Sequence, residues 1–151
     1  MPDVFARFVK HGGQQRLDAG EQVVAVTVSN PPGNLAGASL GGAMGMWRAR
    51  AKAAGHHRGN ALADRLPSAT LYLVLSDKRL VAFSARGAFG KPGDPVCDYN
   101  RSEIRGVERT KRGVLWKASL SFSDGSTRVL EFMSTAHPEA FFDGLDRWMS
   151  Q

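Results

Sequence analysis

The chain has 151 residues, of which 42% are hydrophobic and 23% charged; this suits one globular domain with its own core and excludes a disordered chain. Its single cysteine, Cys97, excludes an internal disulfide, and no uncharged apolar run approaches the roughly 20 residues that a membrane-spanning helix needs. The formal net charge of +6, from 20 basic and 14 acidic side chains, favours an anionic partner such as lipid headgroups or nucleic acid.

Residues 3–10 predict a short amphipathic helix. Val4 and Phe8 fall on one face at a spacing of four, and Gly12-Gly13 ends the segment. Two turns are marginal as a free membrane anchor, so we expect the helix to lie on the body of the domain. Charged residues interrupt this stretch, which argues against a signal peptide and, with the lone cysteine, predicts a cytoplasmic protein.

Two stretches in the first half of the chain predict β-strands. Residues 22–29 are rich in β-branched side chains, as strands are. Alternate valines share one expected face: Val24, Val26 and Val28. Residues 69–84 predict a hairpin, because their alternating apolar pattern is interrupted by the polar turn 76–79. We expect the turn residues to shape the turn rather than bind a ligand.

Between these stretches, at about 34–67, lies an insertion rich in glycine and alanine. Its glycines would each cost a helix about 1 kcal/mol, so we expect helical turns only after them. Between Pro31 and Pro67, five basic side chains stand against one acidic side chain, a net charge of +4. A concentrated basic segment favours an anionic partner.

This insertion offers a contact surface made of Trp47, Arg48, Arg50 and Lys52. Trp47 would dip into the surface of a bilayer while the three cations meet anionic lipid, each contributing about 1 kcal/mol. The alternative, a solvated loop without a partner, stays open.

The second half of the chain continues the β pattern and ends in a helix. We expect a loop at 85–95, which is rich in glycine and proline. Four strands follow, at 96–100, 107–111, 115–122 and 127–133. Pro138 suits the first position of a helix. An apolar stripe follows it: Phe141, Leu145 and Trp148.

Four segments, in this order, are similar to the motifs of one family. Residues 17–24 resemble an opening L..GE.V, and residues 73–83 resemble a hairpin L.LTD.RL..F. Residues 99–107 are similar to a crossing...I..V, and residues 132–145 to a strand-to-helix ending. With these motifs the chain resembles the bacterial pleckstrin-homology-like (PH/GRAM-type) domain family over most of residues 17–149.

The resemblance implies a mainly β fold, a split barrel of about seven antiparallel strands capped by one C-terminal helix. It also implies a single domain over 1–151, with the insertion between its first two strands, that serves as a binding scaffold. Eukaryotic relatives often hold phosphoinositides through basic residues in the first inter-strand loop, but the insertion does not match such a motif residue by residue. Bacterial members also occur as interaction or oligomerisation modules, so the ligand stays open.

The residues give no sign of catalysis or of a bound metal. His56 and His57 are adjacent and would diverge by about 100° in a helix, so they cannot readily share one ion. Cys97 falls in a predicted strand without a histidine nearby in sequence, and we expect it to be buried and inert. The glycines at 87–93 lack the G-K-[ST] ending of a phosphate-binding loop. We predict no enzymatic activity, no cofactor and no metal.

A second basic set spans residues 101–117: Arg101, Arg105, Arg109, Lys111, Arg112 and Lys117. Tyr99 and Trp116 lie near it, as on a nucleic-acid surface, but Glu103 and Glu108 interleave with the cations and favour a solvated face.

The predicted function is a non-catalytic PH-like binding or interaction module, with peripheral contact to anionic lipid at the inner face of the membrane as the first candidate. A protein partner or self-association into a homo-oligomer is the alternative, and nucleic acid is the least favoured partner.

Overall fold

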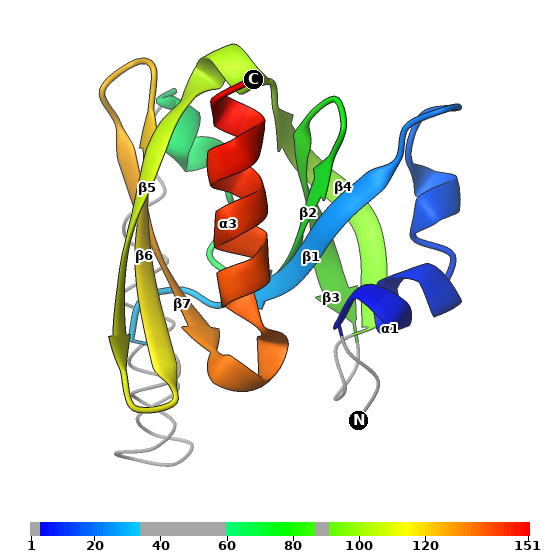
Figure 1. The fold of residues 1–151 in the computed structure, drawn as a ribbon, viewed down its shortest axis with the longest axis horizontal. Helices are drawn as coiled ribbons and strands as arrows, with labels where there is room; N and C mark the ends of the chain where they lie inside the picture. The colour runs from blue at the N-terminus through cyan, green and yellow to red at the C-terminus, as the bar shows by residue number, and fades with distance from the viewer. Residues whose placement is uncertain (1–3, 34–59, 87–90) are drawn as a thin grey trace.

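The computed structural model describes residues 4–33, 60–86 and 91–151, which form two β-sheets and helical elements around them (Figure 1). The helical elements are α1 (Val4–Lys10), η1 (Gln14–Arg16), η2 (Leu62–Arg65), η3 (Arg101–Glu103), η4 (Ser134–Ala136) and α3 (Pro138–Met149), where η marks a 3-10 helix. The strands are β1 (Val23–Ser29), β2 (Leu71–Ser76), β3 (Leu80–Arg86), β4 (Lys91–Tyr99), β5 (Ile104–Arg112), β6 (Leu115–Phe122) and β7 (Thr127–Met133).

Both sheets are antiparallel. The first has four strands in the order β1-β2-β3-β4, and the second has three in the order β5-β6-β7. Within the described residues, one isolated bridge between Asn30 and Glu131 joins the sheets, which do not close into a barrel. The prediction of a mainly β fold with one C-terminal helix is confirmed.

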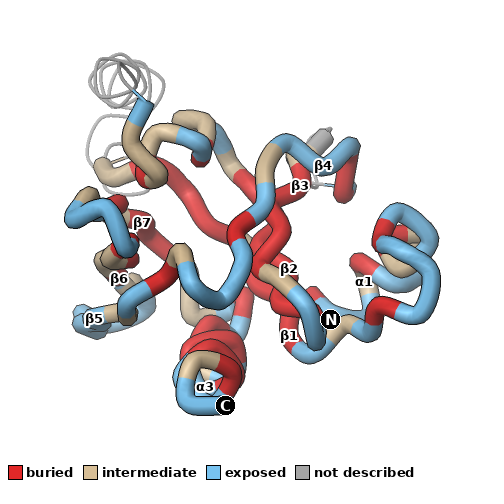
Figure 2. The backbone as a smooth tube through the Cα atoms, turned by 90° about the horizontal axis from the view of Figure 1, so that it is seen from above, coloured by how far each residue is buried: buried red, intermediate tan, exposed pale blue. Residues whose placement is uncertain are grey.

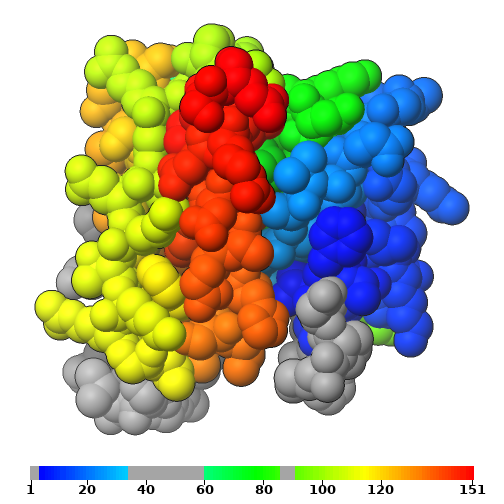
Figure 3. Space-filling model, in the orientation of Figure 1, coloured from blue at the N-terminus to red at the C-terminus, as the bar shows by residue number. Residues whose placement is uncertain are grey.

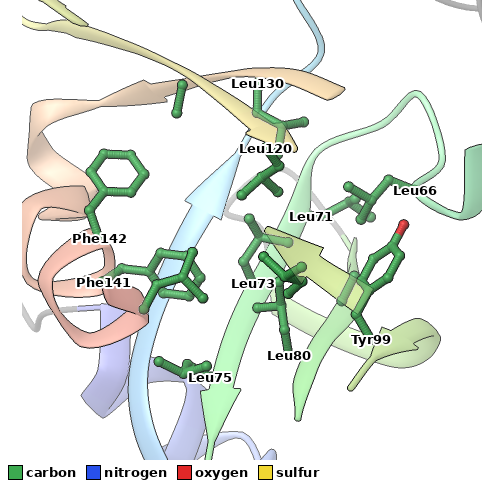
Figure 4. Close-up of a cluster of buried hydrophobic side chains, with 14 of the residues drawn as sticks. Leu66, Leu71, Leu73, Leu75, Leu80, Tyr99, Leu120, Leu130, Phe141 and Phe142 are labelled. Carbon is green, nitrogen blue, oxygen red and sulfur yellow. The ribbon is translucent and has the colours of Figure 1, made fainter. Parts of the chain in front are cut away.

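The main core lies between the two sheets, and α3 covers one side of it against β1 and β5 (Figures 1 and 2). Figure 4 shows leucine side chains of β2 and the rings of Phe141 and Phe142 directed into this core. As predicted, Pro138 begins the helix, and its apolar stripe is buried, including Leu145 and Trp148. Burial of this stripe is what fixes the helix on the sheets.

A second, smaller core lies beneath α1 on the other face of the first sheet. Phe8 is fully buried there, and its ring meets the ring of Phe83 edge-on, with 5.1 Å between the centroids. Val4 is buried beside it, and Tyr72 and Val81 form the sheet side of the cluster. The prediction that this helix lies on the body of the domain is confirmed.

A β-bulge in β1 changes the expected faces of that strand. The register against β2 shifts between Val23 and Ala25. Val26 and Val28 do share the face beneath α1, but Val24 is 49% exposed. Val23 packs with that cluster instead. The face predicted for Val24 is therefore wrong, because the extra residue of a bulge exchanges the two faces on one side of it.

The loop predicted at 85–95 is largely strand. β3 and β4 extend into it, and their register pairs Phe83 with Pro95 and Ala85 with Pro92. Proline is tolerated here because β4 is an edge strand, which pairs with β3 on one side only. A proline whose nitrogen faces the open side removes no hydrogen bond from the sheet. The prediction of a loop is wrong for residues 85–86 and 91–95, whereas 87–90 lie outside the described residues.

Candidate interaction surface

The predicted contact residues Trp47, Arg48, Arg50 and Lys52 lie outside the residues that the structure describes. The structure does describe the residues on both sides of the segment 34–59 that carries them. In sequence this segment follows β1 and precedes β2. The residues that flank it on both sides are held on the sheet β5-β6-β7.

The residues just before the segment are held by Glu131 of β7. Asn30 and Glu131 exchange two backbone hydrogen bonds, with N···O distances of 2.8 and 2.9 Å. The buried carboxylate of Glu131 also accepts a 2.6 Å bond from the N–H of Gly33. Thr70, just before β2, donates its hydroxyl to the side chain of Asn30 at 2.7 Å. The chain entering the segment is therefore fixed to β7 and to the start of β2.

After the segment comes η2, which lies against β6 and β7. The N–H of Leu62 donates to the Asp124 carboxylate at 2.8 Å, and the N–H of Ala63 donates to the Ser126 hydroxyl at 3.1 Å. Hydrogen bonds from the Ser126 side chain and the Leu62 backbone hold the pKa of Asp124 below its ordinary value. The β6–β7 turn thus supplies partners for the free N–H groups of η2.

Tyr99 of β4 joins η2 to the first sheet. Its buried hydroxyl donates to the carbonyl of Leu62 at 2.6 Å, and burial raises the pKa of this phenol. Arg65 of η2 lies over the Tyr99 ring, 5.4 Å from its centroid, and pairs with Glu103 at 2.9 Å. As a result η2 bridges the two sheets.

The cations of the second basic set, at residues 101–117, lie in two different surroundings. Arg109 pairs with Asp146 of α3 at 3.0 Å, and its guanidinium lies 5.4 Å from the centroid of the Phe142 ring. Arg101 lies over the ring of Trp148 at the same distance. These two cations are engaged with α3, so they are poorly placed for an external partner.

Other cations of the set remain directed to solvent. Arg105, Arg112 and Lys117 are exposed, and none makes an ion pair within the described parts of the chain. Lys111 is also exposed, with its ammonium 5.5 Å from the centroid of the Trp116 ring. Three of these four cations stand at the end of the β5–β6 hairpin.

The β5–β6 hairpin ends in an exposed valine, and its end lies at the lower left of Figure 3, in yellow. Val114 is 65% exposed, the highest value for a large hydrophobic residue in the described part of the chain. Its carbonyl accepts bonds from the backbone N–H of Ser134 at 2.8 Å and from the Ser134 hydroxyl at 3.0 Å. We refer to the following residues as the basic turn: Lys111, Arg112, Val114 and Lys117. The sequence indicates the cations of this turn but not the role of Val114, because one apolar residue in a turn makes no pattern.

The β2–β3 turn is occupied by partners within the fold. Arg79 donates to the carboxylates of Glu21 and Asp98, the latter at 2.8 Å. Asp77 accepts a 3.0 Å bond from the backbone N–H of Gln22. These residues stabilise the turn, as expected of turn-forming residues.

Comparison of the chain with known family models and with curated proteins found no match. Among the described residues, no helix has both the length and the apolar character needed to cross a bilayer. In the same residues, no three His, Cys, Asp or Glu side chains gather so that they could hold a metal ion. His56 and His57 lie outside this part of the chain.

Cys97 of β4 is partly buried. Burial, assisted by the charge of Asp98, raises the pKa of its thiol to about 12. Since the thiolate is the reactive form, this cysteine is a weak nucleophile near neutral pH.

Proposed function

We propose that this chain is a non-catalytic interaction module with a PH-like fold, which binds anionic membrane surfaces from the cytoplasmic side through Trp47, Arg48, Arg50 and Lys52. The observation that carries the proposal is the anchoring of the residues that flank the segment 34–59 on both sides. Glu131 holds the residues before it, and Asp124, Ser126 and Tyr99 hold the residues after it. The described part of the chain thus fixes where this basic segment leaves and rejoins the domain.

The order of elements supports the PH-like part of the proposal. The resemblance implies about seven antiparallel strands followed by one C-terminal helix, and the described residues form two antiparallel sheets, of four and three strands, followed by α3. Two of the similar motifs also meet in space, because Glu21 of the first accepts bonds from Arg79 of the second. A fold of this kind does not name its partner, so the partner is argued from charge.

Charge favours an anionic surface as that partner. The segment 34–59 contains four basic residues and no acidic residue. Three of the cations follow Trp47 closely, and tryptophan prefers the interface of a bilayer. Each cation near anionic lipid contributes about 1 kcal/mol, so three contribute about 3 kcal/mol.

Co-sedimentation with vesicles tests the proposal. The variant replaces Arg48, Arg50 and Lys52 by glutamate; a control with the same change in charge replaces Lys78, Lys91 and Arg147. We expect the wild type and the control to pellet with vesicles of three parts phosphatidylcholine to one part phosphatidylserine, but not with pure phosphatidylcholine. The segment variant should stay in the supernatant.

Other outcomes distinguish the remaining partner classes. Equal pelleting of the wild type with both kinds of vesicle would overturn the lipid proposal. Light scattering on the same proteins detects a homo-oligomer, and a mass that falls only in the segment variant would favour self-association through the segment. Binding to DNA that weakens steeply with salt would favour nucleic acid.

A further inference from the structure

We further infer that the basic turn is a second membrane contact of this protein, at which Val114 enters the headgroup region while its neighbouring cations meet anionic lipid. The inference rests on the proposed function, because it names where the folded core touches the same surface. It uses only residues that the structure describes.

Val114 has a larger exposed fraction than the other large hydrophobic residues in the described part of the chain. Its exposure of 65% compares with 49% for Val24, the next highest large hydrophobic residue in the described chain. Single exposed apolar residues are common and need no explanation by themselves. Val114, however, stands in the turn at the end of the β5–β6 hairpin, and this end of the hairpin lies on the outside of the molecule, in yellow in Figure 3.

The backbone of the turn is already fixed. The two bonds from Ser134 hold the carbonyl of Val114. Gly113 adopts a φ of +60°, which closes the turn, and the next pair, Arg112 with Leu115, is in register. Because a fixed turn has little conformational freedom to lose, contact with a bilayer costs it little entropy.

The charge around Val114 is strongly positive. Lys111, Arg112 and Lys117 are exposed, and the last two have no ion pair within the described residues. Glu131 faces Lys117 across the sheet, but it is buried beneath the residues that enter the segment. Glu108, also exposed, lies further along β5. An exposed apolar residue in a turn that is flanked by cations is a composition that suits an anionic interface.

The basic turn also lies close to Gly33, the last described residue before the segment 34–59. Leu115 pairs with Met133, and Glu131, two positions earlier on β7, holds Gly33. A strand rises about 3.3 Å per residue, so Met133 and Glu131 are only about 7 Å apart along β7. The basic turn and Gly33 are therefore separated by only a short distance along the sheet.

Binding to the phosphatidylserine vesicles described above tests the inference. The first variant is Val114→Ser, with Val96→Ser, another exposed valine, as its control. The second replaces Arg112 and Lys117 by glutamate, with the same change at Lys78 and Lys91 as its control. We expect affinity to fall about fivefold or more for each cation lost, and about three- to tenfold for Val114→Ser. Both controls should bind as the wild type does.

A fluorescent probe tests the contact directly. In a Cys97→Ala background, a polarity-sensitive dye is attached at Val114→Cys or, as a control, at Val96→Cys. We expect the emission of the dye at position 114 alone to shift to the blue when phosphatidylserine vesicles are added.

The outcomes separate the two proposals. If the wild type binds but the turn variants match their controls within twofold and the dye at 114 does not shift, the inference is overturned and the proposed function stands. If the wild type fails to bind anionic vesicles, the proposed function fails and the inference falls with it.

Discussion

Arg79 donates two hydrogen bonds to the buried carboxylate of Glu21, from Nε at 3.0 Å and from Nη2 at 3.1 Å. Glu21 comes just before β1, whereas Arg79 belongs to the β2–β3 turn. Burial opposes the charge of Glu21, but the bonds from Arg79 and Ser76 outweigh it and hold the pKa of that carboxyl at about 2. The bonds to Glu21 in turn raise the pKa of Arg79. The pair ties the entry of β1 to the hairpin.

Because of this pair, we expect the free energy of unfolding to depend on pH in the acidic range. Because the pKa of Glu21 is about 2 in the folded protein and 4.5 ordinarily, its stabilisation is complete above pH 4.5 and is lost as the pH falls toward 2. Glu21→Gln should lower the free energy of unfolding at neutral pH by roughly 2–3 kcal/mol. The same substitution should flatten the pH dependence between 4.5 and 2. Urea unfolding across this range measures both effects.

Glu108→Gln is the matched control for that experiment. Glu108 is exposed and makes no ion pair within the described residues. Its variant should keep the wild-type pH profile. Equal slopes for the two variants would contradict the role assigned to Glu21.

Gly13 predicts a steric effect on the packing of α1. A Cβ atom at this position would overlap the ring of Phe8, the buried anchor of the helix. The φ of Gly13 is −60°, so an alanine suffers no backbone strain there. Gly13→Ala should lower the free energy of unfolding by about 1–3 kcal/mol, because Phe8 must move. Gly106→Ala, whose Cβ would meet nothing within 4 Å, should cost much less in the same urea unfolding. Similar losses in both variants would contradict this account.

Parts of the fold could be predicted from the sequence because their alternation is regular. The β2–β3 hairpin keeps one register throughout, pairing Leu73 with Ala82 and Leu75 with Leu80. In β1 the strand was predictable, but the face of Val24 was not, because alternation does not reveal a bulge. The prolines of β4 indicated a loop, because the sequence does not tell which strand lies at the edge of a sheet.

The candidate surface was harder to predict than the fold. Arg109 and Arg112 are similar cations in one strand, but their odd spacing puts them on opposite faces, and only Arg109 meets α3. Sequence spacing does not say which face the helix covers. Glu131 occupies a position that alternation assigns to the wet face, and the residues entering the segment bury it. Burial of a residue by a part of the chain that is distant in sequence leaves no trace in the local sequence pattern.

We expect the hydrogen bond from the Tyr99 hydroxyl to stabilise the position of η2. Tyr99→Phe removes the bond to the Leu62 carbonyl but keeps the ring, which lies 4.8 Å from the ring of Phe122. We expect the free energy of unfolding to fall by about 1 kcal/mol, with faster amide hydrogen exchange in η2 and no change in β6. Tyr99→Leu, which also removes the ring contact, should cost about 2–4 kcal/mol. Unchanged exchange in η2 of Tyr99→Phe would show that this bond does not hold the segment.

Cys97 predicts slow thiol chemistry. With its pKa raised by burial to about 12 from an ordinary 9.0, its thiolate fraction near pH 8 should be about a thousandfold below that of an ordinary thiol. Reaction of the native protein with a chromogenic disulfide reagent should therefore be slow, and unfolding in urea should restore the ordinary rate. Val96→Cys in a Cys97→Ala background places an exposed thiol at the neighbouring position of the same strand, and it should react quickly without urea. If native Cys97 reacts within tenfold of that control, burial does not govern its reactivity, and the expectation of an inert cysteine fails.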